Sequence, residues 1–167
     1  MEDTEAAVAI VRARAPEESI LLIRRADRQD DPWSGHWSLP GGRRDPGDLD
    51  LLHTALRELE EECGVRLGRE QLEAELPVTS VGHLLGHRML VAPFVFSVDH
   101  ELPTVADPEE AAEAVWIPVS VLRDPARRAV QSVPGMPPDR QFPGIALNGV
   151  PLWGFTYKLV TDWLGVK

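Results

Sequence analysis

The chain has 167 residues, of which 43% are hydrophobic and 26% charged, a composition typical of one globular domain over residues 1–167. Its formal net charge of −10 argues against binding genomic DNA or RNA, which depends on cationic contacts to phosphates, although a bound cation could still recruit a small phosphorylated ligand. No apolar run approaches the roughly 20 residues that span a bilayer, Met1–Glu5 does not resemble a secretory signal, and the single cysteine excludes an internal disulfide. We therefore expect a cytoplasmic protein without a membrane partner, and a homodimer remains open.

Apolar runs and turn residues predict short strands in the first part of the chain. The expected elements are strands at Glu5–Ala13, Ile20–Ile23 and Trp37–Leu39, a polar loop over 24–34, a break at Pro40-Gly41-Gly42 and a second loop over 43–47.

A helix is predicted over Leu49–Cys63, because its leucines recur at three- and four-residue spacings and form one apolar stripe. Asp48 is the candidate N-cap of this helix, and Gly64 stands where a left-handed C-terminal cap is expected.

The second half predicts further strands and two helices, which together indicate an α/β (α+β) fold with a mixed sheet between helices. The expected elements are strands over 76–84 and 89–98 joined at Gly86-His87, a strand over 112–117, a short helix from Pro118 to about Arg123, a surface loop over 124–140, a hairpin turn at Asn148-Gly149 between strands 145–147 and 150–152, and a helix over 154–164.

Three glutamates, Glu58, Glu61 and Glu62, lie three and four residues apart and share one face of the predicted helix. We expect no cation one helical turn away to compensate them. Such carboxylates suit hard cations such as Mg²⁺ or Mn²⁺, and the glycine corner could add the carbonyl of Gly41 as a ligand. The alternative is a solvated acidic helix face.

Residues 39–65 resemble the Nudix box, G-x5-E-x7-R-E-U-x-E-E-x-G-U with U aliphatic, and Arg57 to Val65 match its second half completely. In the first half, Asp48 replaces the glutamate and eight residues rather than seven precede Arg57. The resemblance implies a Nudix-type α/β/α sandwich and metal-dependent hydrolysis of a diphosphate. We interpret Asp48 as an N-cap without metal contact.

By this resemblance, the metal ligands are carboxylates of the box and the carbonyl of Gly41. Arg57 anchors the carboxylates, Glu60 faces solvent, and a further carboxylate comes from outside the box. The implied ligands are Glu58, Glu61, Glu62, Gly41 and, from outside, Glu110, with Glu109 and Glu113 as rivals that are otherwise plain surface acids.

The spacing after Asp48 resembles the coenzyme A diphosphatase branch, as do the segments 21–26 and 35–42. Ile23 and Leu39 depart from that branch's pattern, the loop between the segments is one residue longer, and Asp30 stands where an arginine is expected. The resemblance implies a nucleoside diphosphate substrate held by arginines, with Trp33 or Trp37 stacking on adenine. The candidate substrate-binding residues are Arg25, Arg28, Arg43 and Trp37, the last of which alternatively belongs to the core.

The remaining candidates carry weaker signals. Arg127, Arg128 and Arg140 could grip phosphates or be solvated loop charges, His83 and His87 are expected at the surface, and Cys63 is expected to pack inertly.

Three functions stay open at this point. They are hydrolysis of coenzyme A, hydrolysis of another substrate such as ADP-ribose, a nucleotide sugar or a nucleoside triphosphate, and a non-catalytic binding module. Modules of the last kind usually lose box glutamates, and all three are present here.

Overall fold

The computed structural model describes residues 4–27, 35–81, 89–133 and 136–166. In chain order its elements are β1 (Thr4–Ala15), β2 (Ser19–Arg25), β3 (Trp37–Ser38), β4 (Gly41–Arg43), α1 (Leu51–Cys63), η1 (Arg69–Gln71), β5 (Leu72–Glu75), β6 (Thr79–Val81), β7 (Met89–His100), β8 (Ala111–Pro118), α2 (Val119–Arg123), η3 (Pro125–Arg127), β9 (Arg128–Gln131), β10 (Phe142–Leu147), β11 (Val150–Trp153) and α3 (Gly154–Leu164).

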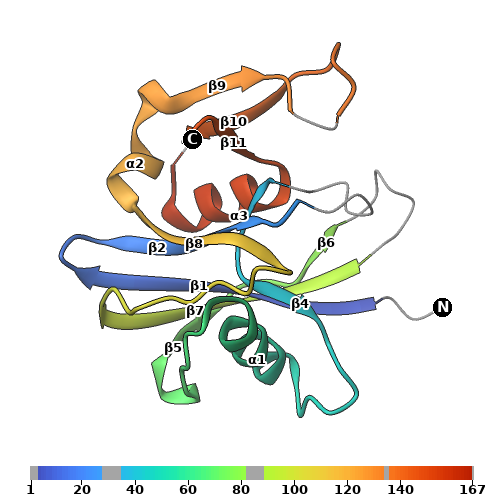
Figure 1. The fold of residues 1–167 in the computed structure, drawn as a ribbon, viewed down its shortest axis with the longest axis vertical. Coiled ribbons are helices and arrows are strands. Elements are labelled where there is room, and N and C mark those ends of the chain that lie inside the picture. Colours follow the sequence, from blue (N-terminus) through green and yellow to red (C-terminus); the bar gives the residue numbers. More distant parts are fainter. Residues whose placement is uncertain (1–3, 28–34, 82–88, 134–135, 167) are drawn as a thin grey trace.

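The described strands form a large mixed sheet and a small one. The large sheet runs β3-β2-β1-β7-β5, with β4 paired to β1, β6 to β7 and β8 to β2, whereas the small sheet runs β11-β10-β9. Strands β1 and β7 are parallel, and the other pairs in the large sheet are antiparallel. Helix α1 lies on one side of the large sheet, and α3 with the small sheet lies on the other (Figure 1). The predicted mixed sheet between helices is therefore confirmed.

Alternation along the strands builds one apolar cluster on each side of the large sheet. Ala7, Ala9 and Val11 of β1 pack with the stripe of α1 in the first cluster. Ile10 of β1 faces the other way and joins residues of α3, β10 and β11 in the second. Small alanines beneath α1 let the helix approach the sheet closely, and this approach places its polar residues beside the β4 backbone.

The turns and both longer helices lie where the sequence predicted them, except that α1 begins at Leu51, two residues later than predicted. Gly64 ends α1 with φ 68°, and α3 spans the predicted residues. Asn148 and Gly149 have φ values of 48° and 80°, the positive values that a tight hairpin turn requires. Within the described residues, no helix combines the length and the apolar character needed to cross a membrane.

The Pro-Gly-Gly segment was predicted to end extended structure, which is confirmed for Pro40, a bend after β3, but was wrong for the two glycines. Gly41, Gly42 and Arg43 form β4, which pairs with Val8, Ala7 and Ala6 of β1. A Cβ at Gly41 would collide with the Ala7 carbonyl oxygen and would lie 2.8 Å from the Val8 Cα. Glycine therefore serves close strand approach here rather than chain reversal.

Three other predictions need correction. Strand β2 runs to Arg25 because Ile23, Arg24 and Arg25 pair with β8, so the loop begins later than predicted. The edge strand β5 was not predicted, and the supposed loop over 124–140 contains β9, which pairs with β10. Of the predicted strand over 76–84, residues 79–81 form β6, whereas residues 76–78 are not in a strand; residues 82–84 and the turn at Gly86-His87 lie outside the described residues.

Candidate active site

The N-terminus of α1 is capped by Asp50, not by Asp48. The Asp50 Oδ1 accepts a 2.8 Å hydrogen bond from the His53 amide, the geometry of an N-cap. Asp48 is instead buried, with 5% of its surface exposed. Its carboxylate accepts from the Thr54 hydroxyl at 2.8 Å and the Asp45 amide at 2.9 Å. The predicted cap was wrong because this carboxylate is already occupied.

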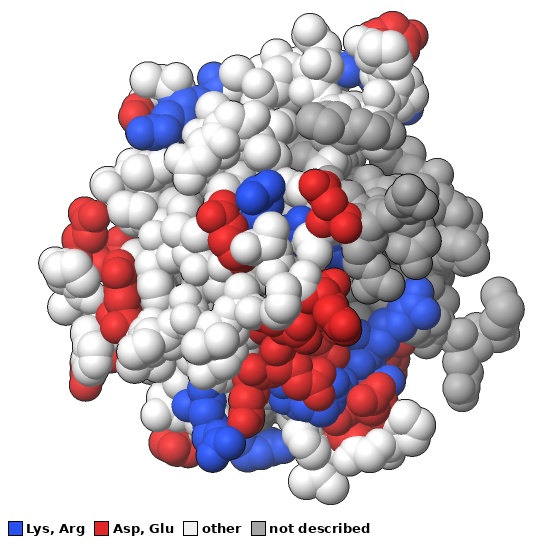
Figure 2. Space-filling view, viewed as in Figure 1, with Lys and Arg blue, Asp and Glu red and all other residues white. Residues whose placement is uncertain are grey.

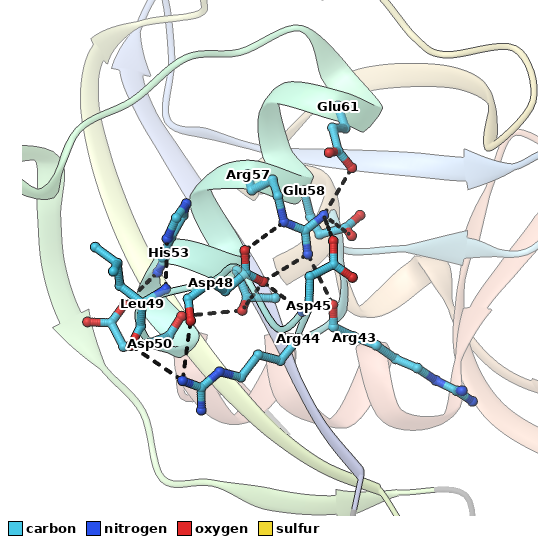
Figure 3. A network of polar contacts seen from close by, with 11 residues as sticks. Arg43, Arg44, Asp45, Asp48, Leu49, Asp50, His53, Arg57, Glu58 and Glu61 are labelled. Atoms are coloured by element: carbon cyan, nitrogen blue, oxygen red, sulfur yellow. Dashed lines mark hydrogen bonds and ion pairs between the residues drawn. The ribbon is translucent and has the colours of Figure 1, made fainter.

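Arg57 is the main partner of Asp48 and links the loop before α1 to the glutamates on the helix. Its Nε and Nη2 donate to the two Asp48 oxygens at 2.9 and 3.0 Å, a bidentate pair (Figure 3). Nη1 donates to Glu58 at 2.9 Å and to Glu61 at 3.1 Å. Nη2 also donates to the Arg43 carbonyl at 3.1 Å. Arg57 thus fixes the position of two box glutamates.

The expectation that no cation lies one turn from the glutamates was wrong. Arg57 stands four residues before Glu61 and pairs with it. Glu61 is 55% exposed at its side chain, whereas that of Glu58 is 13% exposed. Arg57 therefore partly compensates the negative charge of the glutamates, and the exposed Glu61 side chain is directed toward Arg57.

Three carboxylates converge: among the described residues, ligand oxygens of Glu58, Glu62 and Glu110 lie within 4.8 Å of one another. Figure 2 shows the acidic side chains as a continuous patch in the lower half of the visible face, where α1 and β4 lie in Figure 1. Glu110 therefore joins the box glutamates. Its rival Glu113 pairs with Arg24 at 3.1 Å, and neither Glu113 nor Glu109 belongs to the group.

The segment before β8, which carries Glu110, is hydrogen-bonded to the C-terminal end of α1. The Val105 amide donates to the Cys63 carbonyl at 2.8 Å, and the Asp107 amide donates to the Glu62 carbonyl at 3.1 Å. These bonds satisfy carbonyls that a helix end leaves unpaired. The Asp107 carbonyl then accepts from the amides of Glu110 and Ala111. This turn fixes the backbone of Glu110 relative to Glu62.

The glycines of β4 hold the other side of the carboxylate group. The Gly41 amide donates to Glu62 Oε1 at 2.7 Å. A Cβ at Gly42 would lie 2.6 Å from the Glu58 carboxyl carbon, so glycine is needed for that carboxylate to pack against β4. The contact that the structure shows for Gly41 is made by its amide, whereas the sequence pointed to its carbonyl.

Without a bound cation, burial raises the free-energy cost of ionising the carboxylate group. Burial raises the pKa of Glu62 to about 8; the charges of Glu58 and Glu110 add to the rise, while the Gly41 hydrogen bond and Arg25 oppose it. Burial also raises the pKa of Glu58, against the effect of Arg57. Carboxylate oxygens that converge, here from buried Glu62, half-buried Glu58 and exposed Glu110, are the donor set that Mg²⁺ and Mn²⁺ prefer, so these residues fit such an ion.

The predicted substrate residues lie in different settings. Arg25 ends β2, and its charge acts on Glu62. The exposed Arg43 side chain points away from the network in Figure 3. Trp37 is only 4% exposed, and its Nε1 donates to the Leu147 carbonyl at 3.2 Å, so it is a core residue and cannot stack on a substrate. The predicted sites Arg28, Trp33, His83 and His87, together with Asp30, lie outside the described residues.

The weaker candidates also have defined places. Cys63 is fully buried, and burial raises the pKa of its thiol to about 12, which keeps the thiol protonated and inert as predicted. Glu60 is exposed as predicted and pairs with Arg66 at 2.8 Å. The Arg127 Nε lies 3.8 Å from Oδ2 of Asp124. The structure therefore gives these residues packing or surface roles.

One group of side chains escaped the sequence reasoning. Phe142 and Trp153, eleven residues apart in the chain, pack together beside His36. The signal for this contact was the Asn-Gly hairpin turn, which brings β10 and β11 together, but this turn does not identify His36, the residue just before β3, as a partner.

Comparisons with known proteins agree with the fold and with the box. The NUDIX domain profile matches residues 3–135. The chain is 36% identical over 115 residues to an uncharacterised Nudix hydrolase, NudL, of Yersinia pestis, an alignment that covers 68% of this chain and 55% of that relative. It is also 33% identical over 109 residues to an uncharacterised protein of Schizosaccharomyces pombe, covering 62% of this chain and 32% of that relative, so the chain spans about half or less of these relatives' length.

Solved structures share the fold. A MutT/nudix family protein from Enterococcus faecalis superposes with a TM-score of 0.69 at 19% identity, covering 96% of this chain and 60% of that chain. The NUDIX domain of Shewanella oneidensis NrtR, cocrystallised with ADP ribose, gives 0.60 at 20% identity, with coverages of 72% and 75%. Since the profile match spans most of the chain and includes the carboxylate group and the Arg57 network, this chain belongs to the NUDIX domain family.

Proposed function

We propose that this chain hydrolyses the diphosphate linkage of a nucleoside diphosphate derivative with the help of Mg²⁺ or Mn²⁺. The observation that carries the proposal is the convergence of Glu58, Glu62 and Glu110 within 4.8 Å. A bound divalent ion supplies polarisation of the phosphoryl oxygens and a water of lowered pKa. Glu61 and the Gly41 carbonyl border this group and are proposed as further ligands on the strength of the box resemblance.

The chain's own residues would prepare the site for this chemistry. Arg57 holds Glu58 against β4 and partly compensates the negative charge of Glu61 through an ion pair. The Gly41 amide fixes Glu62, whose burial excludes water from one side of the group. Arg25 and Arg43 supply positive charge for the phosphates. A non-catalytic binding module would have no need of all these carboxylates.

Hydrolysis is expected to require an added divalent metal, because three carboxylates at this separation repel one another unless a cation lies between them. The measurement is turnover of a diphosphate substrate before and after exhaustive chelation, followed by titration with Mg²⁺ or Mn²⁺. Activity should vanish on chelation and return on titration. Undiminished turnover in the chelated protein would rule out the proposed metal chemistry.

Coenzyme A is the substrate we propose, on the evidence of the spacing after Asp48 and the two flanking segments, 21–26 and 35–42. It should be cleaved more efficiently than dephospho-coenzyme A, because an arginine contact to the extra phosphate is worth about 1.5–3 kcal/mol. That energy corresponds to roughly ten- to a hundredfold in kcat/KM when the contact is made in the transition state. Arg25 and Arg43 are the described candidates for this contact.

The test is a panel of coenzyme A, dephospho-coenzyme A, ADP-ribose and a nucleoside triphosphate in one buffer, with products resolved by chromatography. ADP-ribose belongs in the panel because the NrtR NUDIX domain binds it. If ADP-ribose or the triphosphate exceeds coenzyme A tenfold in kcat/KM, the coenzyme A assignment fails while diphosphate hydrolysis stands.

A further inference from the structure

The small sheet carries an aromatic face that the catalytic proposal does not use. The rings of Phe142 and Trp153 lie 4.8 Å apart between centroids at 53°, and both side chains are only partly buried. Gly144 is the Cα partner of Trp153, and a Cβ there would lie 2.7 Å from the Leu152 carbonyl oxygen. No side chain therefore rises between the two aromatic residues on this face.

Polar groups border the two rings. The exposed guanidinium of Arg140 lies 5.5 Å from the centroid of the Phe142 ring and over its face. Gln131 is the Cα partner of Phe142 across β9 and β10. Its Nε2 is buried and has no hydrogen-bond partner among the described residues. The face thus combines aromatic carbon with a planar cation and an amide donor that lacks a protein acceptor.

Hydrogen bonds connect this face to the carboxylate group. The Trp153 Nε1 donates to His36 Nδ1 at 2.9 Å, and the His36 carbonyl accepts from the Arg25 amide at 2.9 Å. The next residue, Ala26, donates its amide to the Glu110 carbonyl at 3.1 Å. The backbones of Glu110 and His36 are therefore two strand spacings apart, about 10 Å. These hydrogen bonds tie the aromatic face, by way of β2, to the backbone that carries Glu110.

We propose that Phe142, Trp153 and Arg140 form a subsite for the nucleobase of the substrate, a flat purine or pyrimidine ring. Aromatic rings and guanidinium planes can stack on any of the nucleobases. The subsite rests on the proposed function, because it would bind the nucleobase, the part of the substrate that lies away from the diphosphate to be cleaved. It lies beyond residue 135, where the family match ends.

The test is equilibrium binding without divalent metal, by titration calorimetry, of AMP, GMP, CMP and UMP, with ribose 5-phosphate as the probe that lacks a base. The wild-type chain should bind at least one nucleotide about tenfold or more tightly than ribose 5-phosphate. Arg140→Ala and Phe142→Leu should each reduce this preference at least about fivefold and leave ribose 5-phosphate unchanged. Phe155→Leu, a partly buried phenylalanine of α3, is the matched control and should bind like wild type.

Arg140 is exposed, so its alanine variant tests the subsite even if Phe142→Leu fails to fold. The proposal is overturned if the wild type shows no preference for any nucleotide, or if folded Arg140→Ala keeps the full preference. Because no turnover is measured, the two proposals fail separately. A preference that depends on Arg140, in a chain that hydrolyses no diphosphate, keeps the subsite and rejects the enzyme.

Discussion

Glu62→Gln should lower turnover roughly a hundredfold or more while the fold persists, because even residues that only orient a metal's ligands cost ten- to a hundredfold when changed. The glutamine can still accept the Gly41 amide hydrogen bond that Glu62 accepts at 2.7 Å. It also removes a carboxyl whose charged form is disfavoured by burial and by Glu58 and Glu110, so the melting temperature should stay equal or rise slightly. The measurements are kcat/KM at saturating metal and thermal unfolding.

The matched control is Glu60→Gln, which changes the same residue type on the same helix. Glu60 is exposed, pairs with Arg66 and lies outside the carboxylate group. Its variant should keep activity within about threefold. Near-normal turnover of Glu62→Gln would contradict a metal-binding role, and a lost melting transition would show that Glu62 is structural instead.

Asp48→Asn should cost about 3 kcal/mol of the free energy of unfolding, or roughly 6–12 °C in Tm, because it leaves a half-buried arginine without its main anion. The Asp48 side chain is 2% exposed and that of Arg57 is 19% exposed. Turnover should fall as well, since Arg57 would no longer be held where it positions Glu58. Thermal and denaturant unfolding at neutral pH, with kcat/KM, measure both effects.

The effect of Asp48→Asn has a defined pH dependence. The hydrogen bonds from Arg57, the largest cause, hold the pKa of Asp48 well below its usual value near 3.8. The stabilisation is therefore complete above that usual value and is lost as the pH falls below it. The stability gap between wild type and variant should be constant above about pH 5 and shrink in acid.

Asp45→Asn is the control for this pair, because Asp45 contacts the same Arg57 at 3.5 Å with a 64% exposed side chain. It should cost less than about 1 kcal/mol. Equal losses from the two variants, or a gap that widens below pH 4, would contradict the role given to Asp48.

The sequence predicted those elements whose signals are local. Gly64 and the Asn148-Gly149 turn need positive φ values, and the chain places the right residues there. The edge strands β5 and β9 lack such signals, because they exist through pairing with β7 and β10. Likewise, Asp48 and Asp50 are equivalent as caps until the tertiary structure brings Arg57 to one of them.

The candidate site divides in the same way. Helical spacing alone located Glu58 and Glu62, but it grouped them with Glu61, whose side chain turns to Arg57. The spacing could not choose among the acids near β8, since the position of Glu110 depends on the register of β8 against β2. Trp37 was misjudged because a tryptophan beside a glycine corner gives no sign of which face of the sheet it occupies.

The segment between β7 and Glu110 donates hydrogen bonds to the helix end through main-chain atoms, the amides of Val105 and Asp107. Val105 as a residue is 74% exposed, although its side chain is apolar. We therefore expect related chains to vary the side chain at position 105, whereas gaining or losing a single position would displace the third carboxylate. In an alignment of related chains, this segment should be conserved in length rather than in residue identity.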